Sequence, residues 1–135
     1  MALEKIFKKL IFKPEQDSIK VLKGKGKIHL NVSAINFIDK DTLQYVIYLP
    51  SLDISSYGSS FDKAEQMLFE AVDDFCKYLI KLKIEDIKRE LRSLGWKQDT
   101  LHKKEFSNAH IDMDGNLRDF NAKDNKVSIS RLQAA

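Results

Sequence analysis

The fold of this 135-residue chain is indicated most clearly by residues 57–82, which read YGSSFDKAEQMLFEAVDDFCKYLIKL. From Phe61 onward, apolar side chains recur every three to four residues, the spacing of one face of an α-helix. A hydroxyl from Ser59 or Ser60 can cap the first free amides, and Asp62 suits the positive end of the helix dipole. The stretch therefore predicts a long amphipathic helix whose apolar stripe comprises Ala64, Met67, Leu68, Ala71, Val72, Phe75, Leu79 and Leu82.

The helical spacing extends beyond this stretch, through Ile84, Ile87, Leu91 and Leu94. We expect the helix either to continue or to break near Lys83 and resume. Gly95 then provides a C-terminal cap, because glycine adopts positive φ readily, and Trp96 can pack back on the last turn.

Strand patterns precede the helix. Apolar residues alternate from Ile28 to Ala34, and the apolar phase then shifts to Ile35 and Phe37, which indicates a bulge or a bend. A turn at residues 39–41 leads into a second alternating run at 43–49, closed by Pro50, and residues 52–57 suit a short third strand. The predicted fold is α+β, with a three-stranded antiparallel sheet packed on one long helix, a second helix and short C-terminal strands.

The two ends of the chain are less clearly patterned. Asp114-Gly115 indicates a turn between short strands around Ile111 and Leu117, and residues 127–129 suit a last strand. Residues 3–11 have apolar side chains at helical spacing with lysines between them, which predicts a short basic amphipathic segment. Residues 14–27 are polar, and we interpret this second stretch as a linker or exposed loop. We expect a basic N-terminal arm at 1–27 and a single domain at 28–135.

Composition places the chain among ordinary globular proteins, with 43% hydrophobic and 32% charged residues. No apolar run approaches the length of a membrane span, so we expect a cytoplasmic protein without a membrane role. The single Cys76 cannot form an internal disulfide and is expected to be buried. Of the net charge of +3, residues 1–27 alone contribute +5, from eight lysines against three acids.

One run of residues resembles a known family. It passes from Tyr45 through Pro50-Ser51-Leu52, and then from Tyr57 through Gly58-Ser59-Ser60 into the helix. A hairpin ending in Pro-x-Leu, a strand ending in Gly and a hydroxyl-capped helix together resemble the HicB-like antitoxin family over residues 28–82. Each element has a physical reading, because proline ends a strand, glycine permits a turn and the hydroxyl caps the helix.

This resemblance implies a β-β-β-α core, often oligomeric, that neutralises a small ribonuclease toxin by binding it. The chain departs from the family in three places. Asp53-Ile54 stand where many members have Pro-Gly, residues 1–27 are extra, and the residues after Trp96 lack two successive amphipathic helices. The last departure argues against the operator-DNA binding found in many members.

No catalytic or metal site is evident in the sequence, and we predict neither an enzyme nor a cofactor. His29, His102 and His110 are far apart and lack partners at metal-ligand spacing. The acids at 39, 41 and 53 are expected in turns or at a strand edge, and those at 73 and 74 point in different directions from a helix. A run resembling part of a calcium loop lacks its closing Glu and favours a hairpin turn; it comprises Asp112, Asp114, Asn116 and Asp119.

We therefore predict a regulatory protein that binds a protein partner, with a small toxin as the candidate. The expected contacts lie at the third strand and on the helix: Leu52, Ile54, Tyr57 and Phe69. Because Phe69, Tyr78 and Ile80 fall off the main stripe, a homodimer or higher oligomer is also expected. The alternatives are an accessory protein of a phage or mobile element without a toxin, and nucleic-acid binding through the N-terminal lysines Lys5, Lys8, Lys9, Lys13, Lys23, Lys25 and Lys27.

Overall fold

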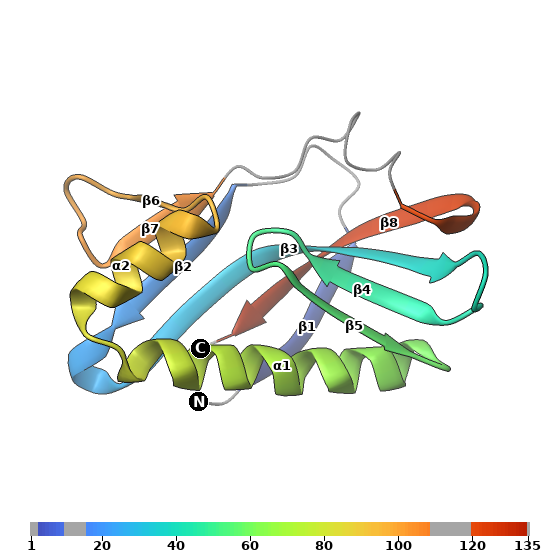
Figure 1. Ribbon diagram of the computed structural model, residues 1–135, viewed down its shortest axis with the longest axis horizontal. Coiled ribbons are helices and arrows are strands. Elements are labelled where there is room, and N and C mark those ends of the chain that lie inside the picture. Colours follow the sequence, from blue (N-terminus) through green and yellow to red (C-terminus); the bar gives the residue numbers. More distant parts are fainter. Residues whose placement is uncertain (1–2, 10–15, 109–119, 135) are drawn as a thin grey trace.

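The computed structural model describes residues 3–9, 16–108 and 120–134. A curved antiparallel sheet arches over the long helix α1 (Phe61–Lys81), which lies along one of its sides (Figure 1). The shorter α2 (Ile84–Ser93) follows it. The remaining elements are β1 (Leu3–Lys9), β2 (Asp17–Leu22), the 3-10 turn η1 (Lys23–Lys25), β3 (Lys27–Asp39), β4 (Tyr45–Leu49), β5 (Ile54–Gly58), β6 (Lys97–Gln98), β7 (Glu105–Asn108) and β8 (Ala122–Ala134).

The α+β class is confirmed, but the predicted three-stranded sheet is wrong. The described residues form one sheet of eight strands, in the order β1-β8-β3-β2-β7-β6, with β4 beside β3 and β5 beside β4. Of the additional strands, β2 directly precedes the β3-β4-β5 meander, whereas β1, β6, β7 and β8 lie farther from it in the chain. Buried polar residues interrupt the apolar pattern of β2 and β8. In β2 the inward position 17 is an aspartate, and in β8 both Ser130 and Arg131 are buried.

Residues 1–27, expected to form an arm, contribute two strands to this sheet. β1 pairs with β8, and β2 lies between β3 and β7, all antiparallel. The helical spacing of residues 3–11 was misleading, because a helix of so few residues is marginal and strand pairing satisfies the backbone instead. The glycine-rich tract after β2 is the short turn η1, which leads into β3.

The change of apolar phase in β3 does not mark a bulge at that point. β3 pairs with β8 from Leu30 to Phe37 without a register shift. Val32, Ser33, Ala34 and Ile35 are all fully buried, because both faces of the sheet are covered here. The apolar pattern therefore records burial on two faces instead of an extra residue.

The helix limits agree with the sequence. The Ser60 hydroxyl accepts a hydrogen bond from the Lys63 amide at 3.3 Å, and the helical region breaks between Lys81 and Ile84. After α2, Gly95 has φ 92°, and the Trp96 amide donates to the Leu91 carbonyl at 3.0 Å. Among the described residues, no helix combines the length and apolar character needed to cross a membrane.

The core lies between α1, α2 and the face of the sheet turned toward them. β3 contributes alternate residues to this face, and β2, β4 and β8 contribute their register partners. The predicted last strand at residues 127–129 is part of β8, whereas the short strands expected around 111 and 117 lie outside the described residues. Fully buried core side chains are Ile19, Ile28, Val32, Ile47, Leu49, Leu68, Val72, Leu79, Ile87, Leu91 and Leu132.

A buried carboxylate joins the two halves of the sheet. One edge of β3 pairs with β2 up to Asn31 and with β4 from Ile35 onward. In the gap, the Ser33 amide and hydroxyl both donate to Asp17 Oδ1, at 3.0 and 2.8 Å. The carboxylate thus replaces the strand partner that the Ser33 amide would otherwise lack.

The same carboxylate has a buried counterion on the other side of β3. Arg131 Nη1 of β8 lies 3.0 Å from Asp17 Oδ1, and the two side chains are only 5% and 3% exposed. The second oxygen, Oδ2, accepts from the Ser51 hydroxyl just after β4, and the Ser51 carbonyl accepts from Trp96 Nε1 at 2.8 Å. The network therefore connects β2, β3, β8, the β4–β5 turn and the segment after α2.

Replacing Arg131 by methionine is expected to destabilise the protein by about 3–5 kcal/mol, because Asp17 would stay buried without its counterion. Urea unfolding followed by circular dichroism measures this loss. The matched control is Lys20→Met, which removes an exposed 4.0 Å contact with Glu105 and should change stability by less than about 1 kcal/mol. Equal effects of the two substitutions would contradict the role given to the buried pair.

Gly58 is required for a close approach and not for its backbone conformation. Its φ is outside the positive region, but an added Cβ would lie 2.7 Å from the Ala64 nitrogen and 2.8 Å from Lys63 Cβ. Gly58→Ala should therefore cost about 1–3 kcal/mol in the same unfolding experiment. Gly24→Ala is the control, since nothing lies within 4 Å of its added Cβ, and a comparable loss there would refute the steric explanation.

Candidate functional site

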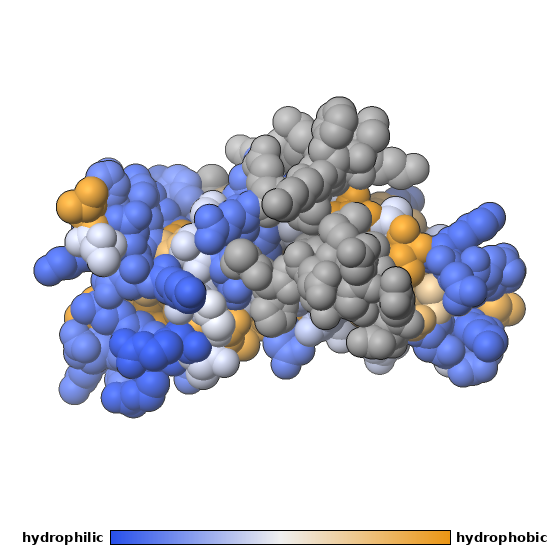
Figure 2. All heavy atoms as spheres, turned by 90° about the horizontal axis from the view of Figure 1, so that it is seen from above, coloured by the Kyte–Doolittle hydropathy of each residue, from blue (hydrophilic) through white to orange (hydrophobic). Residues whose placement is uncertain are grey.

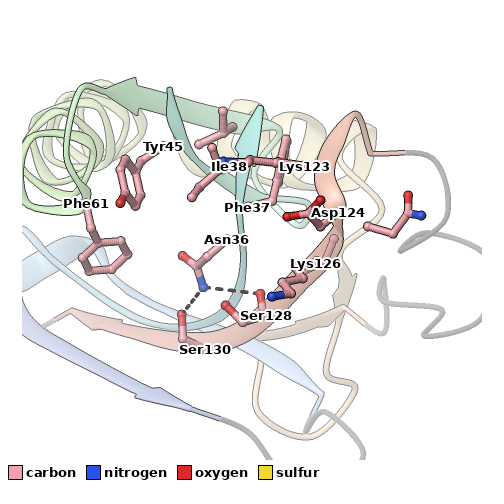
Figure 3. A pocket seen from close by; sticks show the side chains of 13 residues that line it. Asn36, Phe37, Ile38, Tyr45, Phe61, Lys123, Asp124, Lys126, Ser128 and Ser130 are labelled. Carbon is pink, nitrogen blue, oxygen red and sulfur yellow. Dashed lines mark hydrogen bonds between the residues drawn. The ribbon is translucent and has the colours of Figure 1, made fainter. Parts of the chain in front are cut away.

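A groove of about 770 Å³ opens on the sheet face that carries the core, beside the first turn of α1. Its floor comes from β3 and β8, which are neighbours in the sheet, and one wall comes from β4 and the start of α1. Figure 3 shows these side chains around the open space. The lining residues are Asn36, Phe37, Ile38, Tyr45, Val46, Phe61, Lys123, Asp124, Asn125, Lys126, Val127, Ser128 and Ser130.

The floor of the groove is polar. Asn36 Nδ2 donates to the Ser130 hydroxyl at 2.9 Å and to the Ser128 carbonyl at 3.4 Å. The Ser128 carbonyl can only accept, so this pair of contacts fixes which end of the amide is the nitrogen. Asn36 Oδ1 is buried and has no hydrogen-bond partner among the described residues.

The two walls differ in chemistry. Tyr45 and Phe61 stand on one side of the groove, and Lys123, Asp124 and Lys126 lie across from them (Figure 3). The three charged side chains are exposed. The arrangement therefore offers aromatic surface, a polar floor and two lysines against one carboxylate.

An irregularity in β8 builds the charged wall. β3 advances by two residues from Phe37 to Asp39, while its partner advances by five from Val127 back to Ala122. Asp124 and Asn125 both have φ 55°, a left-handed conformation that Asp and Asn adopt more readily than most residues. Two consecutive residues of this kind are typical of a tight turn, so this part of the strand loops outward. The Asp-Asn pair is the signal from which sequence reasoning could have found it.

The four predicted partner contacts do not form one surface. Tyr57 is 55% exposed and Ile54 is partly buried, both on β5. Leu52 and Phe69 are 3% and 6% exposed and belong to the core cluster. Phe69 lies off the main helical stripe but is still buried, because another part of the chain covers that face of α1.

The other off-stripe aromatic residue remains at the surface. Tyr78 is 51% exposed, and its hydroxyl lies 3.5 Å from Glu90 Oε1 of α2. Ile80 is partly buried and packs against the core. On the face shown in Figure 2, hydrophilic side chains predominate at both ends, with a few apolar ones among them.

The lysines proposed for nucleic-acid binding have different surroundings. Lys5, Lys8 and Lys9 belong to β1, and Lys13 lies outside the described residues. Lys23 Nζ donates to the Ile80 carbonyl at 2.8 Å, where its charge suits the negative end of α1. Lys25 and Lys27 are exposed at the surface.

The histidines show no shared site. His29 is exposed on β3, as expected, and His102 is exposed in the loop before β7. His110 and the calcium-loop-like residues 112–119 lie outside the described residues. In the described part of the chain, no group of three or more His, Cys, Asp or Glu side chains is placed to hold a metal ion.

The acidic residues near the meander have structural contacts. Asp39 accepts from the Thr42 amide at 2.8 Å, and this bond, with others from Thr42 and Asn121, lowers the pKa of the carboxyl group. Asp53 accepts from the Tyr48 hydroxyl at 3.1 Å and has φ 51°. That φ lies in the left-handed region, which a proline ring cannot adopt and which Asp tolerates better than most residues.

Comparison of the chain with protein-family models, curated proteins and solved structures found no match.

Cys76 is buried, as the sequence indicated, and 2% of it is exposed. Burial, together with the nearby charge of Asp73, raises the pKa of its thiol to about 12. We expect almost no thiolate at pH 8, so an aromatic disulfide reagent should label Cys76 only as fast as the protein opens. Rapid labelling in buffer that is no faster in urea would contradict this placement.

Proposed function

We propose that this protein binds a protein partner, as an antitoxin-type regulator of the kind that the HicB-like pattern implies. The observation that supports the proposal best is the exposure of Tyr57, on the face of the edge strand β5 opposite the one that Ser56 turns to α1. A cytoplasmic location is part of the same proposal.

The edge strand offers two kinds of contact. β5 pairs with β4 on one side, and no second strand pairs with it among the described residues. An unpaired edge can accept a partner strand through its backbone groups. Tyr57 adds a large, 55% exposed aromatic group, a residue type common among interface hot spots.

This surface is held in place before any partner binds. The Ser56 hydroxyl donates to the Ala64 carbonyl at 2.7 Å, and Gly58 allows the end of β5 to approach the helix backbone. Preorganised surfaces lose less conformational entropy on binding than mobile ones. Such a surface suits a mechanism in which a ribonuclease toxin is neutralised by covering its active surface.

The test is affinity capture of a small toxin encoded beside this protein, expressed with tagged wild-type protein or with Tyr57→Ser. We expect capture by the wild type, protection of the cells from the toxin, and about 30-fold weaker binding by the variant, as for a hot-spot tyrosine. Tyr78→Ser is the matched control, because Tyr78 is similarly exposed at 51% but lies far along α1.

Three results would count against the proposal. They are the absence of a neighbouring toxin, toxin binding without protection, and equal loss of binding by both tyrosine variants. The first would favour an accessory protein that has no toxin partner.

A further inference from the structure

We propose that two copies of this chain associate as a symmetric dimer through the outward side of α1, with the two helices antiparallel. The surface is a row of exposed residues, named the outer line, which comprises Met67, Glu70, Asp74, Lys77, Lys81 and Ile84. It is separate from Tyr57 on β5, so it does not depend on the proposed toxin partner.

The outer line has the geometry of a helix–helix contact. Its residues follow one another at intervals of three and four positions, which is the spacing of a coiled-coil seam. α1 runs along one side of the molecule (Figure 1), and its inward side buries Leu68, Val72 and Leu79 in the core. Ile84 opens α2 directly after the short break that follows α1. Every side chain of the outer line is exposed, so the row is accessible along its whole length.

The charges on the outer line are arranged unfavourably for a single chain. Glu70 and Asp74 are four residues apart, and so are Lys77 and Lys81, and like charges at this spacing destabilise a helix. Lys77 has a compensating partner, because its Nζ lies 2.7 Å from Asp73 Oδ2. Among the ion pairs of the described residues, none includes Glu70 or Lys81. The row therefore has an acidic half and a basic half, each open to the opposite charge.

A second copy supplies these opposite charges when its helix is antiparallel. The midpoint between the two members is the same for every pair, so one two-fold axis brings all of them together. Because the symmetry repeats each contact, both charge pairs and the apolar pair occur twice in the dimer. Across the interface the pairs are Glu70 with Lys81, Asp74 with Lys77, and Met67 with Ile84.

The charge pattern also selects the orientation of the two helices. A parallel pair would place Glu70 against its own copy and Lys81 against its own copy, and both contacts are repulsive. The antiparallel pair converts these repulsions into attractions and sets the two helix dipoles in opposite directions. Exposed ion pairs contribute little individually, so we expect a weak dimer that forms at high protein concentration and dissociates in salt.

Sedimentation equilibrium over a range of protein concentrations measures this association. We expect the wild type to dimerise at low salt and to be monomeric at about 1 M salt, where the screening length is about 3 Å. Glu70→Lys should weaken dimerisation by about tenfold or more, because symmetry makes two attractive pairs repulsive. Combining Glu70→Lys with Lys81→Glu exchanges the signs within each pair and should restore most of the wild-type affinity.

The matched control is Glu105→Lys, which changes the net charge equally on β7, where 45% of the side chain is exposed. It should leave dimerisation unchanged. Met67→Gln alters no charge and should weaken dimerisation by about threefold through the lost apolar contact. Circular dichroism establishes that each variant is folded.

Three results would overturn the proposal. They are a wild-type protein that is monomeric at every concentration, a dimer that Glu70→Lys weakens no more than Glu105→Lys does, and a folded double variant that dimerises no better than Glu70→Lys alone.

Discussion

The architecture depends on the carboxylate of Asp17. A single strand, β3, exchanges one neighbour for another along the same edge, and such an exchange leaves a buried amide between the two neighbours. Asp17 accepts from that amide at Ser33, and Arg131 from the opposite neighbour of β3 balances its charge. Replacing both partners by apolar residues would remove the charge pair but leave the Ser33 amide unsatisfied. The ion pair is therefore part of the backbone hydrogen bonding of the sheet.

The change of strand neighbour along β3, from β2 to β4, also determines where the β5 edge and the groove lie. β2, β6 and β7 belong to one half of the sheet, and β4 and β5 to the other. The β5 edge and the groove are both in the second half, on either side of β4. Tyr45 belongs to both regions, because its side chain lines the groove and its backbone pairs with Gly58 at the end of β5. One short meander supports two surfaces with different chemistry.

The parts of the fold that sequence predicts correctly are those governed by local rules. The meander, the capped start of α1, the break near Lys83 and the glycine after α2 each depend on neighbours within a few residues. Several strands that were missed depend on distant partners, since β1 pairs with β8 and β7 with β2. β2 also pairs with its chain neighbour β3, but its inward Asp17 obscures the apolar alternation. Asp17 and Arg131 look like surface residues in the sequence, and only their pairing in the folded chain makes a buried position suitable for either. The groove was missed for the same reason, since Asn36, Phe61 and Ser130 meet only after β8 joins β3.

The position of β8 has a consequence for biosynthesis. This strand is made after all the other described strands, and it inserts between β1 and β3, which are made much earlier. Until it emerges, one whole edge of β3 has no β8 to pair with, and Asp17 has no Arg131. Pairings between such distant segments form slowly, and open strand edges favour association between chains. A nascent chain stalled before residue 122 would therefore be a natural client for chaperones, and a truncated product would be prone to aggregate.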